Sequence, residues 1–419
     1  MHTEKNSIFF DETKTYDLIV VGAGPTGSMA AKYALKNGVK NVLIIEEHSS
    51  IGSPVQCAGI ISTSAYEESE IGYGADSDLC ILEKFKGAFV YSPSGNILSF
   101  EGKETMAYSI SRKIFDRKIA ESAASLGAKF KLKTKCLGVE RKNGLMEIKV
   151  NEAGTLKTFY SKIVIAADGF KSAVAKSYGL SVSSKLLSGY QIELSGMKNV
   201  PGYVQIFIGS VAPGFFGWSV PISPTQSRVG LAFDTDSENY VSWKNASGYM
   251  EELVKKVSGN EDINLSQMSI NFGVIPLGYM KKTYGSGFMV VGDAAGHCKP
   301  FSGGGIKLGL QAAKIAGKVA AQAISENNFS ESFMEKYEKE WKSEFGKEID
   351  IGMRIHNIRN GLSDDDLDSF IEILYKPEIC EMISNYGDID KPSILFKKFL
   401  LSKHSYKMLK LIPLRRLLS

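Results

Sequence analysis

Apolar runs, a glycine-rich turn and an alanine-rich stretch follow one another in a regular order near the start of the chain. Residues 16–21 are apolar and β-branched over the length of a buried strand, and Gly22-Ala23-Gly24-Pro25-Thr26-Gly27 follows directly. Residues 28–37 predict a helix whose small residues allow close packing on a sheet. Residues 41–45 predict a second strand. In this strand, turn, helix, strand order a glycine-rich turn binds a nucleotide.

The residues of this turn have distinct expected roles. Gly22 permits the tight turn, Ala23 and Gly24 bring the backbone close to a pyrophosphate, and Gly27 lets the helix lie against the strand. The helix N-terminus offers N–H groups and partial positive charge to the phosphates. Glu46 lies about 20 residues beyond the glycines, the usual offset for an acid that binds ribose hydroxyls. Because a carboxylate there repels a 2′-phosphate, the turn predicts FAD or NAD and disfavours NADP.

A second glycine-rich region favours FAD over NAD. Residues 288–291 predict a buried strand that delivers Gly292 and Asp293 at its carboxyl end, where the carboxylate can accept hydrogen bonds from ribityl hydroxyls. NAD has no such hydroxyls. Ser302-Gly303-Gly304-Gly305-Ile306 then opens a helical pattern that extends to residue 325. The N-terminus of this helix would face the pyrimidine edge of an isoalloxazine ring and stabilise the negative charge of reduced flavin.

These motifs resemble those of FAD-dependent oxidoreductases with the para-hydroxybenzoate-hydroxylase fold, and within that group the geranylgeranyl reductase family. The resemblance covers nearly the whole chain. Arg112 stands ahead of a predicted helix, as in the second cofactor segment of the fold, and is an expected cofactor contact. Cys136 falls where the family passes backbone along the adenine, and Ala167-Asp168-Gly169 matches the middle motif. The resemblance implies an α/β fold: a Rossmann-like, glutathione-reductase-type FAD-binding domain, an antiparallel-sheet substrate domain and a helical C-terminal region.

One loop carries a motif that is more specific to the family. Gly52-Ser53-Pro54-Val55-Gln56-Cys57-Ala58-Gly59 is similar to the Pro-x-x-Cys-Gly segment of prenyl reductases, which places a thiol beside the flavin. The resemblance implies that Cys57 and Ala58 contact the cofactor. We expect Cys57 to lie close to flavin N5 and to assist positioning or proton delivery. Read without the family, a lone cysteine is more often buried and inert.

A second specific motif is aromatic. Pro213-Gly214-Phe215-Phe216-Gly217-Trp218-Ser219-Val220-Pro221 resembles the family's aromatic-x-Trp-x-Phe-Pro motif, with Val220 in place of the usual Phe. Phe215, Phe216, Trp218 and Pro221 would then line a tunnel for a prenyl chain. Ile222 stands where a Lys often follows the Pro, so pocket width and headgroup contacts differ from the family pattern. Without the resemblance, such an aromatic cluster is also consistent with ordinary core packing.

Length and composition fit a two-domain protein, with 43% hydrophobic residues among 419. We expect a discontinuous FAD-binding domain from residues 16–80, 108–180 and 283–345. Residues 81–107 and 181–282 would form the antiparallel substrate sheet, and residues 346–419 a C-terminal helical region with a basic amphipathic tail.

The five cysteines form no CxxC pair and no close Cys/His cluster, which argues against zinc and iron–sulfur sites. No apolar run reaches the length of a membrane span, and residues 1–15 lack the apolar core of a signal peptide. The expected location is therefore the cytoplasm, with peripheral contact at a membrane surface as an addition.

The expectation of membrane contact comes from the C-terminal tail. Residues 391–419 contain eight Lys or Arg and no Asp or Glu, and without those eight the formal net charge of +4 would be −4. Leucine, isoleucine and phenylalanine interleave with the basic residues, as in segments that bind anionic membranes. A helix docked on the protein with its charges in solvent is the alternative. Basic residues confined to one apolar tail argue against nucleic-acid binding.

The resemblance implies a reductase that uses FAD to saturate C=C bonds of geranylgeranyl chains, with members that act on archaeal membrane glycerolipid precursors (digeranylgeranylglycerophospholipid) as the most similar. No second nucleotide fingerprint follows a strand, so electrons are expected from an external donor, either a ferredoxin-like protein or a reduced nicotinamide. A flavin-dependent monooxygenase of the same fold is one alternative. A non-catalytic flavoprotein that binds prenyl lipid is another.

Overall fold

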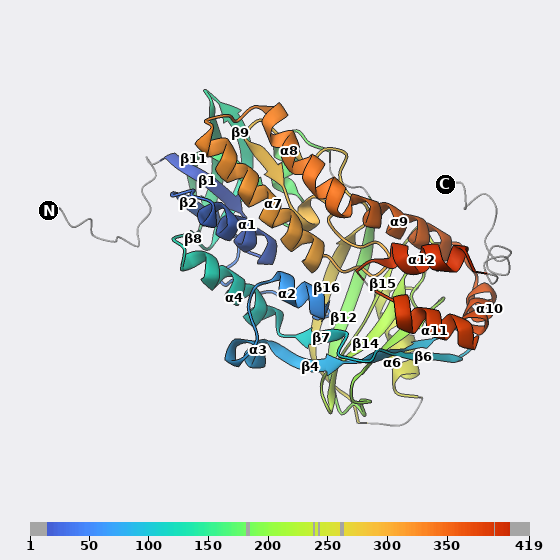
Figure 1. Cartoon of the computed structure of the whole chain (residues 1–419). Coiled ribbons are helices and arrows are strands. Elements are labelled where there is room, and N and C mark those ends of the chain that lie inside the picture. The colour runs from blue at the N-terminus through green and yellow to red at the C-terminus, as the bar shows by residue number, and fades with distance from the viewer. Residues whose placement is uncertain are drawn as a thin grey trace.

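The structure, a computed structural model, describes residues 15–181, 185–237, 239–241, 244–259, 264–388 and 390–402 (Figure 1). For residues 76–78 and 400 it describes the backbone alone. Three sheets organise this part of the chain, with eight, seven and three strands. Strands and helices are mixed throughout, as expected of an α/β fold.

The eight-stranded sheet forms the nucleotide-binding half of the molecule. Its strands are β1 (Thr15–Val21), β2 (Val42–Ile45), β8 (Lys129–Lys131), β9 (Thr134–Lys142), β10 (Leu145–Glu152), β11 (Thr155–Ala166), β17 (Tyr284–Gly285) and β18 (Phe288–Val290). The main order is β17-β18-β11-β1-β2-β8, and the run from β18 to β8 is parallel. β10 pairs antiparallel with both β11 and β9.

Both faces of this sheet are covered, so its central strand is apolar on both sides. Leu18 and Val20 of β1 pack under the helices on one face, in a core shared with α1 (Pro25–Lys36) and α7 (Ile306–Ser325). Ile19 and Val21 point to the other face and pack with residues of β9, β10 and β11. Figure 1 shows α1 and α7 side by side over the sheet, with α4 (Arg112–Ala124) next to α1.

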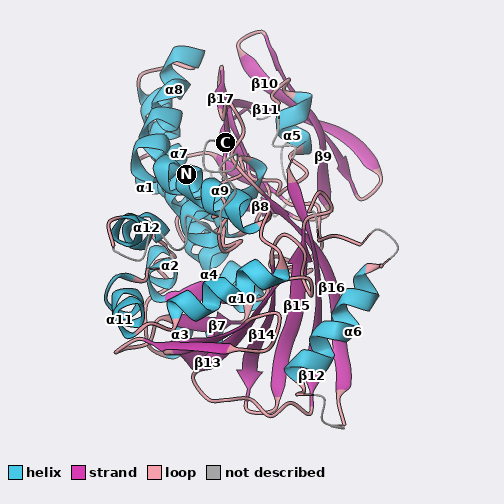
Figure 2. Ribbon diagram, turned by 90° about the vertical axis from the view of Figure 1, so that its right-hand side faces the viewer, coloured by secondary structure: helices cyan, strands magenta, loops and turns pink. Residues whose placement is uncertain are grey.

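The seven-stranded sheet forms the other half. Its strands are β5 (Gly87–Tyr91), β6 (Ile97–Glu101), β12 (Leu186–Ser195), β13 (Tyr203–Ile208), β14 (Phe216–Ser223), β15 (Gln226–Phe233) and β16 (Ser266–Pro276). Their order is β16-β12-β15-β14-β13-β5-β6, and every neighbouring pair is antiparallel except β13 and β5. One face packs against α6 (Ala246–Val257), which lies along the sheet in Figure 2.

A small sheet and a set of helices join the two halves. The small sheet contains β3 (Ile60–Ser62), β4 (Ile81–Phe85) and β7 (Ala107–Ile110), with α2 (Thr63–Glu68) and α3 (Ala75–Cys80) beside it. The short α5 (Ala173–Ser177) follows β11. After α7 come α8 (Glu331–Trp341), a π-helical turn (Lys342–Gly346), α9 (Lys347–Arg359), α10 (Asp364–Leu374), α11 (Pro377–Tyr386) and α12 (Pro392–Leu400).

The expected local elements are present, with shifted boundaries. The first helix starts at Pro25 rather than residue 28, because Gly24 is its N-cap and proline suits the first helical position. The expected strand 288–291 ends at Val290, since the chain turns into a 3₁₀ turn, η1 (Gly292–Ala294). The second sheet is not purely antiparallel, because β5 joins it in parallel beside β13. The division into domains with the boundaries given above stays a prediction.

Only the first part of the basic tail lies within the described residues. α12 packs against α9 and α11 and buries Phe399, so this part of the tail is docked on the protein. Residues 403–419 of the predicted tail lie outside the described residues. In the part of the chain that is described, none of the helices combines the length and apolar character needed to cross a bilayer.

The close approach of α7 to α1 gives a stability prediction. A Cβ at Gly317 would lie 2.5 Å from the carbonyl oxygen of Ala30 and 2.8 Å from the backbone nitrogen of Ala34. We therefore expect G317A to lower the free energy of unfolding by about 1–3 kcal/mol, because the two helices must move apart. Chemical denaturation of the purified variant measures this.

Gly346 provides the matched control, because it is also a buried helical glycine. A Cβ there would make only ordinary contacts, the nearest at 3.5 Å. G346A should be neutral or stabilise by up to about 1 kcal/mol, since alanine favours helices over glycine. Equal effects of the two substitutions would show that the α1–α7 approach is not what makes Gly317 necessary.

Candidate functional site

The glycine-rich turn places the N-terminus of α1 beside a large cavity. In the described structure no side chain caps α1, and its first turn contains no acidic residue. A Cβ at Gly24 would meet no atom within 4 Å, whereas one at Gly27 would lie 2.0 Å from the carbonyl oxygen of Gly22. Gly24 thus leaves room at the cavity, and Gly27 lets the helix approach the turn. Uncapped N–H groups at a helix N-terminus suit a phosphate, so this turn fits a pyrophosphate.

Glu46 closes the same turn from the end of β2. One carboxylate oxygen accepts the Ala23 N–H at 2.9 Å, and the other accepts the His48 N–H at 2.9 Å. The side chain is 12% exposed. The carboxylate is therefore fixed beside the turn, where the sequence predicted an acid for ribose hydroxyls.

The second glycine-rich region, from Gly292 to Ile306, contributes polar groups and a second helix N-terminus. Asp293 in η1 is accessible from the cavity, and burial on its other sides raises the pKa of its carboxyl. The Ser302 hydroxyl is buried and has no hydrogen-bond partner in the described structure. Gly304, Gly305 and Ile306 line the cavity where α7 begins. Unsatisfied polar groups facing a cavity beside a helix N-terminus fit the polar edge of a flavin and its ribityl chain.

Arg112 and Asp168 are two further predicted cofactor residues. Arg112, the first residue of α4, lines the cavity and donates two hydrogen bonds to Asp116, at 2.8 and 2.9 Å. Burial lowers the pKa of its guanidinium, but Asp116 and Cys57 more than offset this, so the pKa is raised overall. Asp168 accepts the Val174 N–H at 3.0 Å with one oxygen, while its other oxygen is buried without a partner. Burial raises the pKa of Asp168.

Cys136 is the predicted cofactor residue with the weakest link to the cavity. It lies in β9, packs against the core on the far face of the sheet and does not line the cavity. Burial raises the pKa of its thiol to about 12. The expected contact was to backbone along an adenine, so its role stays a prediction.

The loop with Cys57 is held between the two halves of the molecule. The Cys57 sulfur accepts the Gly59 N–H at 3.3 Å and faces the cavity. Arg228 of β15 donates to the carbonyl oxygens of Ala58 at 3.0 Å and Ile110 at 3.1 Å. Burial lowers the pKa of Arg228. This arginine anchors the loop to the seven-stranded sheet.

The aromatic motif forms the opposite wall of the cavity. Phe215 and Phe216 stack with ring centroids 4.3 Å apart, and the Trp218 ring lies edge-on to Phe216 at 6.2 Å. The Trp218 indole N–H donates to Gln191 at 3.1 Å, and the Gln191 amide donates to the Cys57 carbonyl oxygen at 3.2 Å. Gln191 thus links the two motifs that carry the family resemblance.

Strand alternation decides which residues of this motif reach the cavity. Phe216, Trp218 and Val220 line it because they lie on one face of β14. Pro221 holds the alternate position in β14 and is not among the residues that line the cavity, so its place in the tunnel wall stays a prediction. Val220 does line the cavity.

Gln191 and Arg228 were not predicted from the sequence. Both lie in strands with other polar residues, such as Glu193 and Ser227, and Gln191 is 7% exposed. Their local pattern therefore does not mark them as buried, and only the fold shows that each has a specific partner.

Together these elements enclose one cavity of about 410 Å³. The predicted site residues that line it are Gly24, Cys57, Ala58, Arg112, Phe215, Phe216, Trp218, Gly292, Asp293, Gly304, Gly305 and Ile306. Gly22, Ala23, Gly27, Glu46 and Asp168 lie outside this lining. The cavity therefore combines a dinucleotide site with an apolar, aromatic compartment.

Comparisons with known proteins agree with this arrangement. Residues 15–347 match the FAD binding domain family. An uncharacterized protein of Methanocaldococcus jannaschii is 34% identical, covering 92% of this chain and 95% of its own length. The digeranylgeranylglycerophospholipid reductase of Methanosarcina acetivorans is 35% identical, covering 86% of this chain and 88% of its own length.

Solved structures extend the comparison to the fold. A geranylgeranyl bacteriochlorophyll reductase-like protein from Thermoplasma acidophilum has a TM-score of 0.83 at 27% identity and covers 95% of this chain and 100% of its own. The p-nitrophenol 4-monooxygenase of Pseudomonas putida, at 15% identity, has a TM-score of 0.69 and covers 94% of this chain and 98% of its own, and it shares the fold alone. The cofactor of this chain is FAD, and the chain belongs to the geranylgeranyl reductase family of FAD-dependent oxidoreductases.

Proposed function

We propose that this protein saturates C=C bonds in the geranylgeranyl chains of an archaeal membrane glycerolipid precursor. One observation supports this above the others. The cavity brings the flavin-binding motifs, the Cys57 loop and an aromatic wall together, with Gln191 bonded to both Cys57 and Trp218. An apolar chain fits such a wall, and the names of the relatives point to the same substrate class.

The cofactor residues divide by what they offer. The N-termini of α1 and α7 would present N–H groups to the phosphates and the flavin, Glu46 would bind ribose hydroxyls, and Asp293 would accept from ribityl hydroxyls. Reduced FAD held by these residues would supply hydride chemistry. Saturation of one alkene would then take up one hydride and one proton, which equals two electrons and two protons, and an external donor and the solvent would replace them.

The residues of the chain act on the alkene, which is the hydride acceptor in this reaction. An isolated alkene accepts hydride only as positive charge develops on carbon, so the site needs a dry wall and a proton source. Phe216 and Trp218 line the wall and exclude water. The Cys57 thiol faces the cavity and assists positioning or proton delivery.

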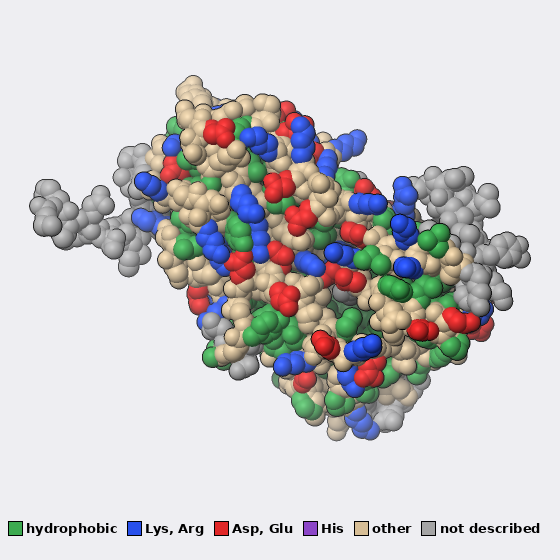
Figure 3. Space-filling model, viewed as in Figure 1, with side chains coloured by type: hydrophobic (Ala, Val, Ile, Leu, Met, Phe, Trp, Pro, Cys, Tyr) green, Lys and Arg blue, Asp and Glu red, His purple; other side chains and the backbone are tan. Residues whose placement is uncertain are grey.

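Electron donor and membrane contact belong to the same proposal. A ferredoxin-like protein or a reduced nicotinamide supplies the electrons. Peripheral contact with a membrane has support at α12, where Ile394 and Leu401 are 41% and 77% exposed beside the exposed Lys397 and Lys398. Figure 3 shows hydrophobic and basic side chains intermixed over α12, whereas α11 contains Glu378 and Glu381 and no Lys or Arg.

Anaerobic turnover separates the proposed reaction from its alternatives. Chemically reduced protein mixed with a digeranylgeranyl lipid should yield product heavier by successive pairs of hydrogen atoms in mass spectrometry. A monooxygenase would need oxygen and add an oxygen atom instead. A lipid-binding flavoprotein would return the lipid unchanged. Absence of any hydrogenated product with reduced protein would refute the reductase.

Replacing Cys57 tests its part in the reaction. C57A should retain FAD and lower turnover by about 100-fold if the thiol delivers the proton, because general acids typically contribute that much or more. Single-turnover oxidation of the reduced protein by lipid measures the effect. C380A is the control, since Cys380 lies in α11 away from the cavity lining. Unchanged turnover in C57A would remove Cys57 from the mechanism.

Glu46 gives a test of the cofactor assignment. E46Q should raise the Kd for FAD at least about tenfold, since hydrogen bonds to charged groups contribute about 1.5–3 kcal/mol. Flavin fluorescence titration of apoprotein measures it, and unfolding of the apoprotein reports any structural effect. E47Q changes a neighbouring carboxylate that is 51% exposed and should bind FAD normally. Equal FAD affinity in E46Q and wild type would contradict the ribose contact.

A further inference from the structure

A group of polar side chains lies in the cavity wall beside the start of α7, and the reaction described above does not use it. We call it the anion cluster. Its members are Ser62, Ser64, Lys299 and Lys307. Ser62, Lys299 and Lys307 line the same cavity as Cys57 and Trp218.

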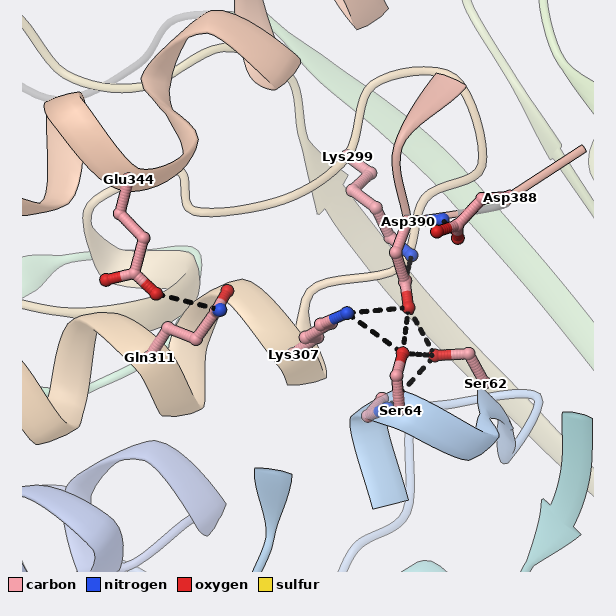
Figure 4. Close-up of polar contacts among 9 residues, drawn as sticks. Ser62, Ser64, Lys299, Lys307, Gln311, Glu344, Asp388 and Asp390 are labelled. Carbon is pink, nitrogen blue, oxygen red and sulfur yellow. Dashed lines mark hydrogen bonds and ion pairs between the residues drawn. The ribbon is translucent and has the colours of Figure 1, made fainter. Parts of the chain in front are cut away.

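All four members contact one carboxylate. Lys299 Nζ lies 2.5 Å from one oxygen of Asp390, and Lys307 Nζ lies 3.0 Å from the other. The Ser62 hydroxyl donates to that second oxygen at 2.7 Å, and Ser64 donates to it as well (Figure 4). Four convergent donors, two of them ammonium groups, form the kind of site that binds phosphate oxygens.

Both lysines of the anion cluster lie in a buried setting beside the start of α7. Lys307 is in the first turn of this helix, which contains no acidic residue of its own, although the Asp293 carboxylate lies close to Gly305, the N-cap. Both lysine side chains are largely buried, at 11% and 15% exposure. Two ammonium groups and two hydroxyls thus converge on one carboxylate, and the oxygens of a phosphate group suit the same four donors.

Asp390 reaches this cluster from a separate part of the chain. It lies between α11 and α12, 328 positions from Ser62, and its side chain is 2% exposed. Burial alone would raise the pKa of Asp390, but Lys299 and the two serines hold it below its usual range. Nearby Asp388 is exposed and accepts the Asp390 N–H at 2.7 Å, which shapes the turn. The carboxylate therefore occupies the anion cluster as an internal anion.

We propose that the anion cluster binds the phosphate or pyrophosphate headgroup of the prenyl lipid, and that Asp390 is the internal anion this headgroup displaces. This rests on the proposed function, because it assigns the headgroup of that substrate. The cavity continues from the cluster to the aromatic wall, so a lipid held here by its headgroup extends its chain past Cys57 and Trp218.

Lipid binding by the FAD-loaded protein tests the headgroup site. The probes are digeranylgeranylglyceryl phosphate, neutral digeranylgeranylglycerol and inorganic pyrophosphate, titrated by tryptophan fluorescence and flavin absorbance. K299M and K307M should raise the Kd for the phosphate lipid at least about tenfold and leave the Kd for the neutral lipid unchanged. An equal loss of affinity for both lipids would overturn the proposal, because the lysines would then act only through the fold.

Lys314 supplies the matched control. It lies on the same helix as Lys307, has the same 15% side-chain exposure and is also ion-paired, to Glu68 at 2.6 Å and Glu70 at 3.1 Å. It does not line the cavity. K314M should leave the affinity for the phosphate lipid unchanged. A loss as large as that in K307M would overturn the proposal.

Inorganic pyrophosphate distinguishes the two sources of such an anion. Weak binding that competes with the phosphate lipid supports a headgroup site that also needs the prenyl chain. Pyrophosphate binding as tight as the lipid, without competition, would overturn the headgroup assignment in favour of a site for a free anion.

Displacement of Asp390 is tested separately. D390N removes the competing carboxylate and should tighten binding of the phosphate lipid by about tenfold. Hydrogen exchange of residues 390–402 in the unaltered protein does not depend on the folding of that variant. Exchange in these residues should become faster with the phosphate lipid and not with the neutral lipid. An unchanged exchange rate would overturn the proposed displacement of Asp390.

Failure of this inference is distinguishable from failure of the proposed function. If reduced protein hydrogenates neutral digeranylgeranylglycerol while K307M lowers the affinity for both lipids alike, the reductase function is supported and the headgroup site is refuted. If neither lipid is hydrogenated, the proposed function itself falls.

Discussion

The cavity depends on how the Cys57 loop is fixed to the seven-stranded sheet. That loop follows β1 and β2 of the nucleotide-binding sheet in sequence, but its backbone carbonyls are held by Gln191 and Arg228 of the other sheet. Both side chains are largely buried, so each lost hydrogen bond would leave an unsatisfied polar group as well as a loosened loop. Directional bonds through Gln191 fix the Cys57 backbone relative to Trp218 more exactly than apolar packing alone could.

Local chemistry explains why part of this architecture was predictable. β1, the turn and α1 form a contiguous unit in which glycines and apolar periodicity act over a few residues, and β18 with α7 is a second such unit. The residues that position the site come instead from pairings far apart in the chain. Gln191 is 134 positions from Cys57, and Asp390 is 328 positions from Ser62. No local pattern reports the strand register or the helix docking that brings such pairs together.

Pro221 shows at shorter range that a sequence motif does not report how a strand is oriented. Its motif was recognised, but which of its residues face the cavity depends on the phase of β14, and a strand places alternate residues on opposite faces. The fold as a whole is shared with a p-nitrophenol 4-monooxygenase, so it does not decide the reaction. Under the proposed function, that decision rests with the cavity walls: the Cys57 loop, the aromatic motif and the anion cluster at the start of α7.

The aromatic wall is electrostatically uneven. The guanidinium of Arg359 lies 4.5 Å from the ring centre of Phe215 and 5.6 Å from that of Phe216, and burial lowers its pKa to about 9, so it is still charged near neutrality. A carbocation-like centre beside these two rings would meet an existing positive charge, whereas no such cation lies over Trp218 among the described residues. A polyprenyl chain presents several alkenes of nearly equal intrinsic reactivity. For the proposed reaction, this asymmetry would make the wall beside Trp218 a better place for developing positive charge than the wall beside Phe215 and Phe216.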